Sequence, residues 1–314
     1  GGTVYSCQRW GKDKKKLLGD CVVKTTALSG LQTWGEGEVR YLVREAKLLF
    51  MMGQHPNLLE FYGAFSDKNT LYFVTERLSK DLKQLQMERG KPVTYTAAED
   101  LYKIAIEMLT GLEQMHKKGF YHFDIKPENV MLKIGKDGEF TTKLIDFGLT
   151  RHLITQSDDD FYDITQNAGG TFPYWTPERV NRKKRDCEDK ICLAKQDGYA
   201  AGLTILDALI APQGKGKELI REFGFISSYM NDKNNIQSHY QDKIPGTEMQ
   251  KALRMKRIDG LANVALKLAA KRPSKRMTIS LAIQKLKLLR SKLPPARPSK
   301  EGRKPLKKKS VAVK

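Results

Sequence analysis

The pattern of apolar and polar positions predicts a strand-rich first part of the chain. Short runs rich in Val, Tyr and Thr predict strands over residues 2–7 and 20–25. Two further strands are expected over 58–65 and 70–75, on either side of a polar turn. Between the two pairs, apolar residues at helical spacing over 36–53 predict a helix. This part is therefore expected to be a sheet with one helix.

After residue 78 the apolar positions follow a helical period. The stretch 97–118 has a long apolar stripe, and the later helical patterns cover 197–211, 249–255, 259–270 and 278–292. We therefore expect an α+β protein with two lobes and a cleft between them. The small β-rich lobe covers residues 1–78, and the larger, mostly helical lobe covers residues 79–292.

The last segment, 293–314, differs from the rest in its charge. It has eight Lys or Arg residues against one acidic residue, and its four prolines oppose a helix. A disordered basic tail is the expectation. The net charge of +20 favours acidic partners, which are nucleic acid, anionic lipid or acidic protein segments. The alternative is that the charge serves only solubility and a short basic targeting signal.

The cysteine pattern bears on the cellular compartment. Cys7, Cys21, Cys187 and Cys192 are too few and too irregular for a disulfide framework or a zinc site. We expect reduced thiols in a cytosolic environment. No apolar run approaches the roughly 20 residues of a membrane helix, so no transmembrane segment is expected. A cytoplasmic or nuclear location is the prediction.

Two short segments combine the residue types that phosphoryl transfer requires. They are His122-Phe123-Asp124-Ile125-Lys126-Pro127-Glu128-Asn129 and Asp146-Phe147-Gly148. Asp124 can accept a hydrogen bond from the hydroxyl that attacks the phosphate, and Lys126 can offset charge in the transition state. Asn129 and Asp146 offer the oxygen ligands that Mg²⁺ prefers. Together they predict a site for transfer of a phosphoryl group.

In order and spacing, these segments resemble the catalytic loop and the Asp-Phe-Gly motif of the protein kinase family. Lys126 is typical of its serine/threonine branch. The resemblance implies the bilobal protein kinase fold, ATP with Mg²⁺ or Mn²⁺, and transfer of the γ-phosphate to Ser or Thr of protein substrates. One alternative is a pseudokinase scaffold that binds nucleotide and partners without turnover. The other is a kinase for a small molecule or lipid.

The resemblance extends to the first lobe. Lys24 ends the run Cys21-Val22-Val23-Lys24, which is similar to the family's Val-Ala-Ile-Lys. Glu45, on the helix expected over 36–53, matches the family's partner of that lysine. Gly1-Gly2-Thr3-Val4-Tyr5 resembles the second half of the glycine-rich loop. The match implies truncation inside that loop, with Gly2 as its last glycine and Val4 covering the adenine.

The same match implies the rest of the nucleotide pocket. It makes Thr75 the gatekeeper and assigns the backbone of Glu76 and Leu78 to hydrogen bonds with the adenine. Asp81 would contact the ribose, and Val22 and Met131 would sandwich the adenine ring. It also implies an ordered stack of apolar and aromatic side chains through both lobes, which is Leu49, Phe61, His122 and Phe147.

Later residues resemble features of protein kinases that act on proteins. Thr176-Pro177-Glu178 is similar to the family's Ala-Pro-Glu, and Thr171 precedes it at the family spacing. The resemblance implies that Thr171 bonds Asp124 and Lys126 and shapes the pocket for the substrate residue after the acceptor. It also implies that Asp197 anchors the catalytic loop and that Arg276 pairs with Glu178.

One residue departs from the family pattern. Phe123 stands where an arginine usually precedes the catalytic aspartate. In many relatives that arginine binds a phosphate on the activation loop, and phenylalanine cannot make this contact. We therefore expect phosphorylation at Thr155, Ser157 or Thr165 to change activity little.

Overall fold

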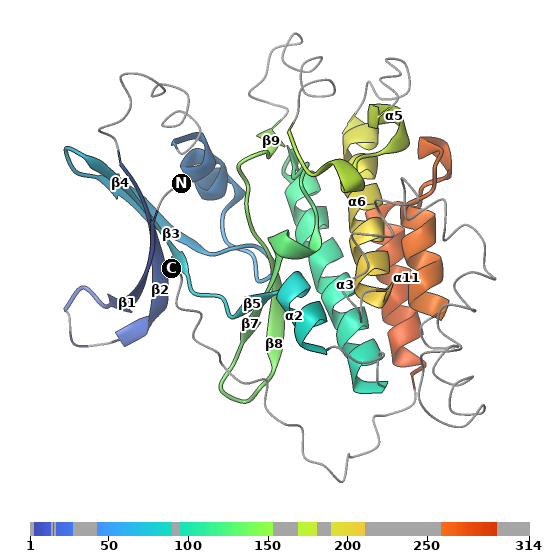
Figure 1. Cartoon of the computed structure of the whole chain (residues 1–314), viewed down its shortest axis with the longest axis horizontal. Coiled ribbons are helices and arrows are strands. Elements are labelled where there is room, and N and C mark those ends of the chain that lie inside the picture. Colours follow the sequence, from blue (N-terminus) through green and yellow to red (C-terminus); the bar gives the residue numbers. More distant parts are fainter. Residues whose placement is uncertain are drawn as a thin grey trace.

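The computed structural model describes residues 3–13, 15, 17–27, 43–89, 95–152, 169–180, 190–210 and 259–293. Figure 1 shows a twisted sheet on one side of the molecule and a group of helices on the other. This is the expected division into a β-rich and a helical lobe. The helix expected over 249–255, the tail over 293–314 apart from its first residue, and Gly2 lie outside the described residues.

The sheet of the first lobe has four antiparallel strands in the order β1-β2-β4-β3. Their bounds are β1 (Thr3–Trp10), β2 (Leu17–Ala27), β3 (Phe61–Ser66) and β4 (Thr70–Glu76). The predicted strands are thus present, although β3 begins three residues later than expected. A helix over 43–52 lies beside the sheet and buries Leu48, Leu49 and Met52.

The pairing of β1 with β2 corrects the prediction for two cysteines. The register places Cys7 directly opposite Cys21, with a Cα–Cα distance of 4.8 Å, and the structure joins them in a disulfide. The expectation of reduced thiols is therefore wrong for this pair, because the register of two neighbouring strands brings together cysteines that are 14 residues apart in the sequence. Cys187 and Cys192 lie outside the side chains that the structure describes.

The second lobe is built around three long helices, α3 (Tyr95–Lys117), α6 (Lys190–Ile210) and α11 (Ile279–Ser291). They lie side by side in Figure 1, and α3 and α6 contact each other as do α3 and α11. Leu109, Leu112 and Met115 of α3 are fully buried, as its apolar stripe predicts. Within the described residues, no helix is long and apolar enough to span a membrane.

Two close contacts explain how α6 is positioned and where α11 begins. Gly202 of α6 lies against the helix over 259–268, where an added Cβ would be only 2.6 Å from the carbonyl oxygen of Ala265. A larger residue would therefore separate the two helices. Helix α11 begins after Thr278, whose hydroxyl accepts a hydrogen bond from the amide of Leu281 at 3.3 Å.

The remaining elements are short. They are β5 (Lys80–Asp81), α2 (Leu82–Arg89), β6 (Phe120–Tyr121), η1 (Pro127–Asn129), β7 (Val130–Ile134), β8 (Phe140–Leu144), β9 (Arg151–His152), η3 (Phe172–Tyr174), α5 (Pro177–Val180) and η4 (Pro273–Lys275). Strand β7 pairs with β5 and β8, and β6 pairs with β9. These pairings hold the loops that follow β6 and β8 next to each other.

Candidate active site

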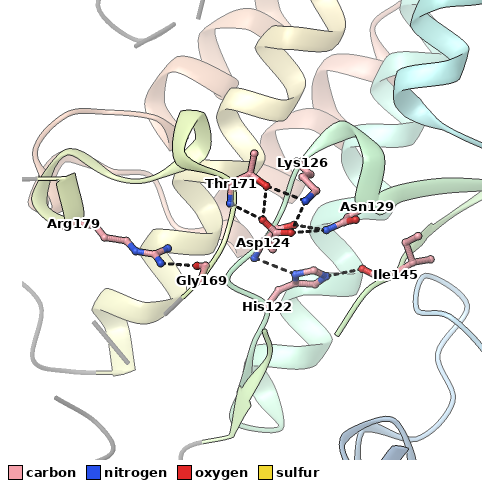
Figure 2. A network of polar contacts seen from close by, with 8 residues as sticks. All are labelled: His122, Asp124, Lys126, Asn129, Ile145, Gly169, Thr171 and Arg179. Carbon is pink, nitrogen blue, oxygen red and sulfur yellow. Dashed lines mark hydrogen bonds and ion pairs between the residues drawn. The ribbon is translucent and has the colours of Figure 1, made fainter. Parts of the chain in front are cut away.

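The loop between β6 and η1 presents Asp124 at the centre of a network of polar contacts (Figure 2). Lys126 Nζ donates to Asp124 Oδ2 at 2.6 Å and to Thr171 Oγ1 at 2.9 Å. The amide and the hydroxyl of Thr171 both donate to Asp124 Oδ1 at 2.9 Å. The contacts expected of Thr171 with Asp124 and Lys126 are therefore present, and they fix the direction of the carboxylate.

These contacts also determine the charge of Asp124. Burial by itself would raise the pKa of Asp124, but hydrogen bonds from Lys126 and Thr171 and the charge of Lys126 outweigh it and hold the pKa below its ordinary value. The carboxylate is therefore ionised at neutral pH. An ionised, oriented carboxylate is suited to accept a hydrogen bond from an acceptor hydroxyl.

The β7–β8 hairpin brings Asn129 and Asp146 to the same place. Asn129 directly precedes β7, and Asp146 follows β8 by two residues. Because the register pairs Val130 with Leu144, both side chains lie at one end of the hairpin. The amide of Ile145 donates to Asn129 O at 3.1 Å, which joins the two segments beyond the last strand pair.

Hydrogen bonds decide which atoms of this pair remain for a cation. Asn129 Nδ2 donates to Asp124 O at 2.8 Å and to Asp124 Oδ2 at 3.1 Å. The amide oxygen of Asn129 therefore faces away from Asp124. Asp146 has a backbone φ of 63°, a left-handed conformation that is uncommon for residues other than glycine. The donor set of one amide oxygen and one carboxylate fits a hard cation such as Mg²⁺.

Asp197 of α6 holds the backbone of the catalytic loop, as the resemblance implied. Its carboxylate accepts from the amides of His122 at 2.8 Å and Phe123 at 2.9 Å. His116 Nε2 donates to it at 2.8 Å. Burial would raise the pKa of Asp197, but the hydrogen bond and charge of His116 lower it below the ordinary value. These contacts stabilise the left-handed backbone of Phe123, whose φ is 67°.

Phe123 packs into a small apolar cluster of its own, with Tyr121 and Leu193. Leu149, just after the Asp-Phe-Gly segment, packs against the same cluster. An apolar contact thus takes the place where the family pattern has an arginine. Thr155, Ser157 and Thr165 lie outside the described residues, so the expectation about their phosphorylation stays a prediction.

The expected stack of four side chains is partly visible in ring contacts. The rings of His122 and Phe147 lie 5.4 Å apart between their centroids, and both side chains are fully buried. Leu49 is buried in the same core, and Phe61 packs against that core. These contacts attach the segment with Asp146 to both lobes.

Lys24 and Glu45 lie close enough to interact electrostatically, but they form no direct ion pair within 4.0 Å in the described part of the chain. Burial raises the pKa of Glu45, and the charge of Asp146 adds to this effect. The charge of Lys24 and a backbone hydrogen bond from Phe147 act in the opposite direction. Glu45 therefore lies between Lys24 and the segment with Asp146, without closing on the lysine.

We expect Glu45→Gln to raise the midpoint of thermal unfolding at pH 7. The folded-state pKa of Glu45 is above its ordinary value, so the buried charge costs stability above that pKa. As the pH falls through the folded-state pKa, Glu45 is protonated and this cost disappears. The difference between variant and wild type should therefore shrink on going from pH 7 to about pH 4.

Calorimetry at the two pH values measures this difference. Glu139→Gln is the matched control, because the side chain of Glu139 is 58% exposed. A lower midpoint for Glu45→Gln at pH 7 would show that the charged form of Glu45 is stabilising, contrary to the expectation.

The described positions assigned to the nucleotide pocket lie along β1, β2, β4, β5 and β7, apart from Leu78, which lies between β4 and β5. The register places Val22 opposite Thr75 and Val4 opposite Lys24. It places Met131 opposite Asp81. Asp81 Oδ1 accepts from the amide of Gln84 at 2.7 Å, so that oxygen caps α2. Burial raises the pKa of Asp81.

The side chain of Glu76 has a structural role that the sequence did not indicate. The resemblance assigned a role only to its backbone, but Glu76 is 2% exposed and its carboxylate faces two lysines. Its Oε1 lies 2.5 Å from Lys143 Nζ, and its Oε2 lies 2.7 Å from Lys133 Nζ. These two ion pairs hold the end of β4 against the β7–β8 hairpin, which leads to Asp146. The available signal in the sequence was Lys143, a charged residue next to the apolar residues that precede Asp146.

A buried ion pair fixes the end of the segment that carries Thr171. Arg276 donates to both carboxylate oxygens of Glu178, at 2.5 and 2.6 Å. Both residues are buried, and Arg276 also donates to the carbonyl oxygen of Ala270 at 2.8 Å. The pairing that the resemblance implied is therefore present, with the bidentate geometry that favours arginine.

The comparisons with known proteins agree with this geometry. CDPK-related kinase 7 of Arabidopsis thaliana is 32% identical over 180 residues, which cover 57% of this chain and 29% of that protein. Sporulation protein kinase mde3 of Schizosaccharomyces pombe is 32% identical over 163 residues, 49% of this chain and 27% of that protein.

The name of a third relative gives two acceptor residues. The membrane-associated tyrosine- and threonine-specific cdc2-inhibitory kinase wee-1.3 of Caenorhabditis briggsae is 30% identical over 166 residues, 52% of this chain and 22% of that protein. The chain thus spans less than a third of the length of these three relatives. The family model described as protein kinase domain matches residues 1–286. This chain belongs to the protein kinase family.

Proposed function

We propose that this protein transfers the γ-phosphate of ATP to serine and threonine hydroxyls of protein substrates. The observation that carries the proposal is the carboxylate of Asp124, which Lys126 and Thr171 hold in one direction beside Asn129. The presence of Lys126 in the loop supports the serine/threonine class. The relatives' names support a protein kinase, and that of wee-1.3 gives both tyrosine and threonine as its acceptors.

In this mechanism Asp124 orients the acceptor hydroxyl. A bond forms between that oxygen and the γ-phosphorus, and the bond from the γ-phosphorus to the bridging oxygen of ADP breaks. Asp124 takes up the proton of the hydroxyl as its oxygen loses electron density. Lys126 offsets negative charge on the phosphoryl oxygens. Thr171 keeps Asp124 in place and forms one side of the substrate pocket.

The residues present fit a divalent cation. Asn129, through its amide oxygen, and Asp146 would hold Mg²⁺, with Mn²⁺ as an alternative. When bound, the cation neutralises charge on the phosphate oxygens of ATP. Lys24, held near Glu45, would contact the α- and β-phosphates. The adenine and ribose would lie against Val4, Val22, Thr75, Glu76, Leu78, Asp81 and Met131, with Gly2 over the phosphates.

A pseudokinase scaffold is the second candidate, and one observation favours it. Lys24 and Glu45 interact without a direct ion pair, whereas an active kinase requires this pair in place. The basic segment 293–314 would serve either function by binding acidic partners in the cytoplasm or nucleus.

Phosphoamino-acid analysis tests both candidates. The full chain is incubated with radiolabelled ATP, Mg²⁺ and a mixed protein substrate, and Asp146→Ala is the control. We expect phosphoserine and phosphothreonine with wild type and almost none with the variant. Dominant phosphotyrosine would contradict the substrate class. Binding of ATP without any transfer would contradict the enzyme and favour the scaffold.

A further inference from the structure

Arg179 of α5 is a cation beside the substrate pocket that the proposed mechanism does not use. Its guanidinium stacks on the indole of Trp175, with Cζ 4.1 Å from the ring centroid. One of its nitrogens donates to the carbonyl oxygen of Gly169 at 2.6 Å (Figure 2). No carboxylate in the described part of the chain forms an ion pair with it. Most of its donors are therefore not committed to a described partner.

Trp175 contributes a second unused donor at the same place. Its Nε1 is buried and has no hydrogen-bond acceptor in the described part of the chain. It lies beside Gly170, where an added Cβ would be 3.2 Å from Nε1 and 3.0 Å from the carbonyl oxygen of Phe123. Only glycine fits at this close approach. A buried N–H group without an acceptor costs free energy, and a ligand oxygen could remove this cost.

The two donors line the same pocket as the catalytic carboxylate. A small hollow of about 20 Å³ is lined by Asp124, Thr171, Trp175 and Arg179, and also by Phe123. Burial lowers the pKa of Arg179 to about 10, so the guanidinium remains charged at neutral pH. Asp124 is near enough to act on it electrostatically. The pocket therefore has a negative group where the acceptor hydroxyl must lie and a positive group a short distance away.

We propose that Arg179 and Trp175 form a subsite for the carboxylate of an acidic substrate residue, directly after the phosphorylated serine or threonine. The inference rests on the proposed function and adds a substrate class to it. An extended peptide advances by about 3.3–3.6 Å per residue, so a neighbour of the acceptor remains within reach of this pocket. Arginine pairs with carboxylates through two parallel hydrogen bonds, and the stacked guanidinium is held in one plane for such contacts.

Three peptides that differ only in the residue after the acceptor test the proposal. That residue is Glu, Gln or Lys, and kcat/KM is measured for each at low salt with wild type and Arg179→Glu. We expect wild type to prefer the Glu peptide over the Lys peptide by about tenfold or more, the scale of one charge-assisted hydrogen bond. Arg179→Glu should reverse this order. Lys285→Glu, an equal charge change at an exposed position of α11, should leave the order unchanged.

Two results would overturn the proposal. One is an unchanged ratio of Glu to Lys peptide in Arg179→Glu. The other is an equal loss for all three peptides, which would mean that Arg179 only supports the loop through Gly169 and Trp175. If Arg179→Glu fails to fold, Arg179→Gln takes its place, and it should lose the preference for Glu without gaining one for Lys.

A binding measurement separates this inference from the proposed function. Fluorescence anisotropy is measured with the same peptides carrying alanine in place of the acceptor residue. If no peptide is phosphorylated but the Glu peptide binds more tightly to wild type than to Arg179→Glu, the proposed function fails and the subsite stands. If phosphorylation occurs without any effect of Arg179 on the Glu-to-Lys ratio, the subsite fails and the proposed function stands.

Discussion

Asp124→Asn is expected to lower kcat for peptide phosphorylation by about 10²–10⁴-fold, the usual range for loss of a general base. The amide cannot take up the proton of the acceptor hydroxyl. Its NH₂ group would also face donors, because Lys126 and Thr171 both donate to this carboxylate. The KM for ATP should change little, since in the proposed mechanism Asp124 contacts the acceptor and not the nucleotide. Steady-state kinetics with a serine peptide measures both constants.

A matched substitution separates this effect from a general loss of charge. Asp137 lies in the exposed turn between β7 and β8, away from the site. The kcat of Asp137→Asn should therefore stay near that of wild type. Thermal unfolding of both variants shows whether the fold is retained. Turnover of Asp124→Asn within a few-fold of wild type would contradict the mechanism.

Arg276→Met is expected to destabilise the fold by about 3–5 kcal/mol, because it leaves the buried carboxylate of Glu178 without its partner. The double variant Glu178→Leu with Arg276→Met removes both charges. It should regain much of this loss, since two apolar side chains need no ion partner. Equilibrium unfolding in urea measures the free energy of each variant. The coupling term from the double-mutant cycle gives the interaction between the two residues.

Arg290→Met is the control, because Arg290 and Glu99 form a long, partly exposed pair at 3.8 Å. Its loss should cost no more than about 1 kcal/mol. If the double variant is as unstable as Arg276→Met alone, then the contacts of Arg276 with other groups, such as Ala270 O, dominate its contribution.

The sequence was sufficient for features that depend on residues close together in the chain. The helical period of α3 and the β-type runs of β2 and β4 predicted elements that the structure contains. The spacing of Asp124, Lys126 and Asn129 placed them together, because all three fall within the eight residues that separate β6 from β7. Asp146 could be added because its Asp-Phe-Gly motif follows at the family spacing, two residues after β8.

Two contacts between separate elements were decided only by the tertiary structure. The register of β1 and β2 joined Cys7 to Cys21, which the cysteine spacing did not indicate. Glu76 turned out to pair with Lys133 and Lys143, because the end of β4 lies against the β7–β8 hairpin. Neither pairing follows from a local period, since each depends on which faces of separate elements meet.

Lys24 and Arg179, two basic residues beside the active centre, also show which features came from the sequence and which from the tertiary structure. Lys24 and Glu45 could be named from their motifs, but their separation depends on where the helix over 43–52 lies relative to β2. Arg179 carried no motif, and its position over Trp175 results from the path of the chain between Thr171 and α5. The sequence by itself determined the residue types and their local order. The tertiary structure decided their distances and charges, because burial and packing act between segments that the sequence does not bring together.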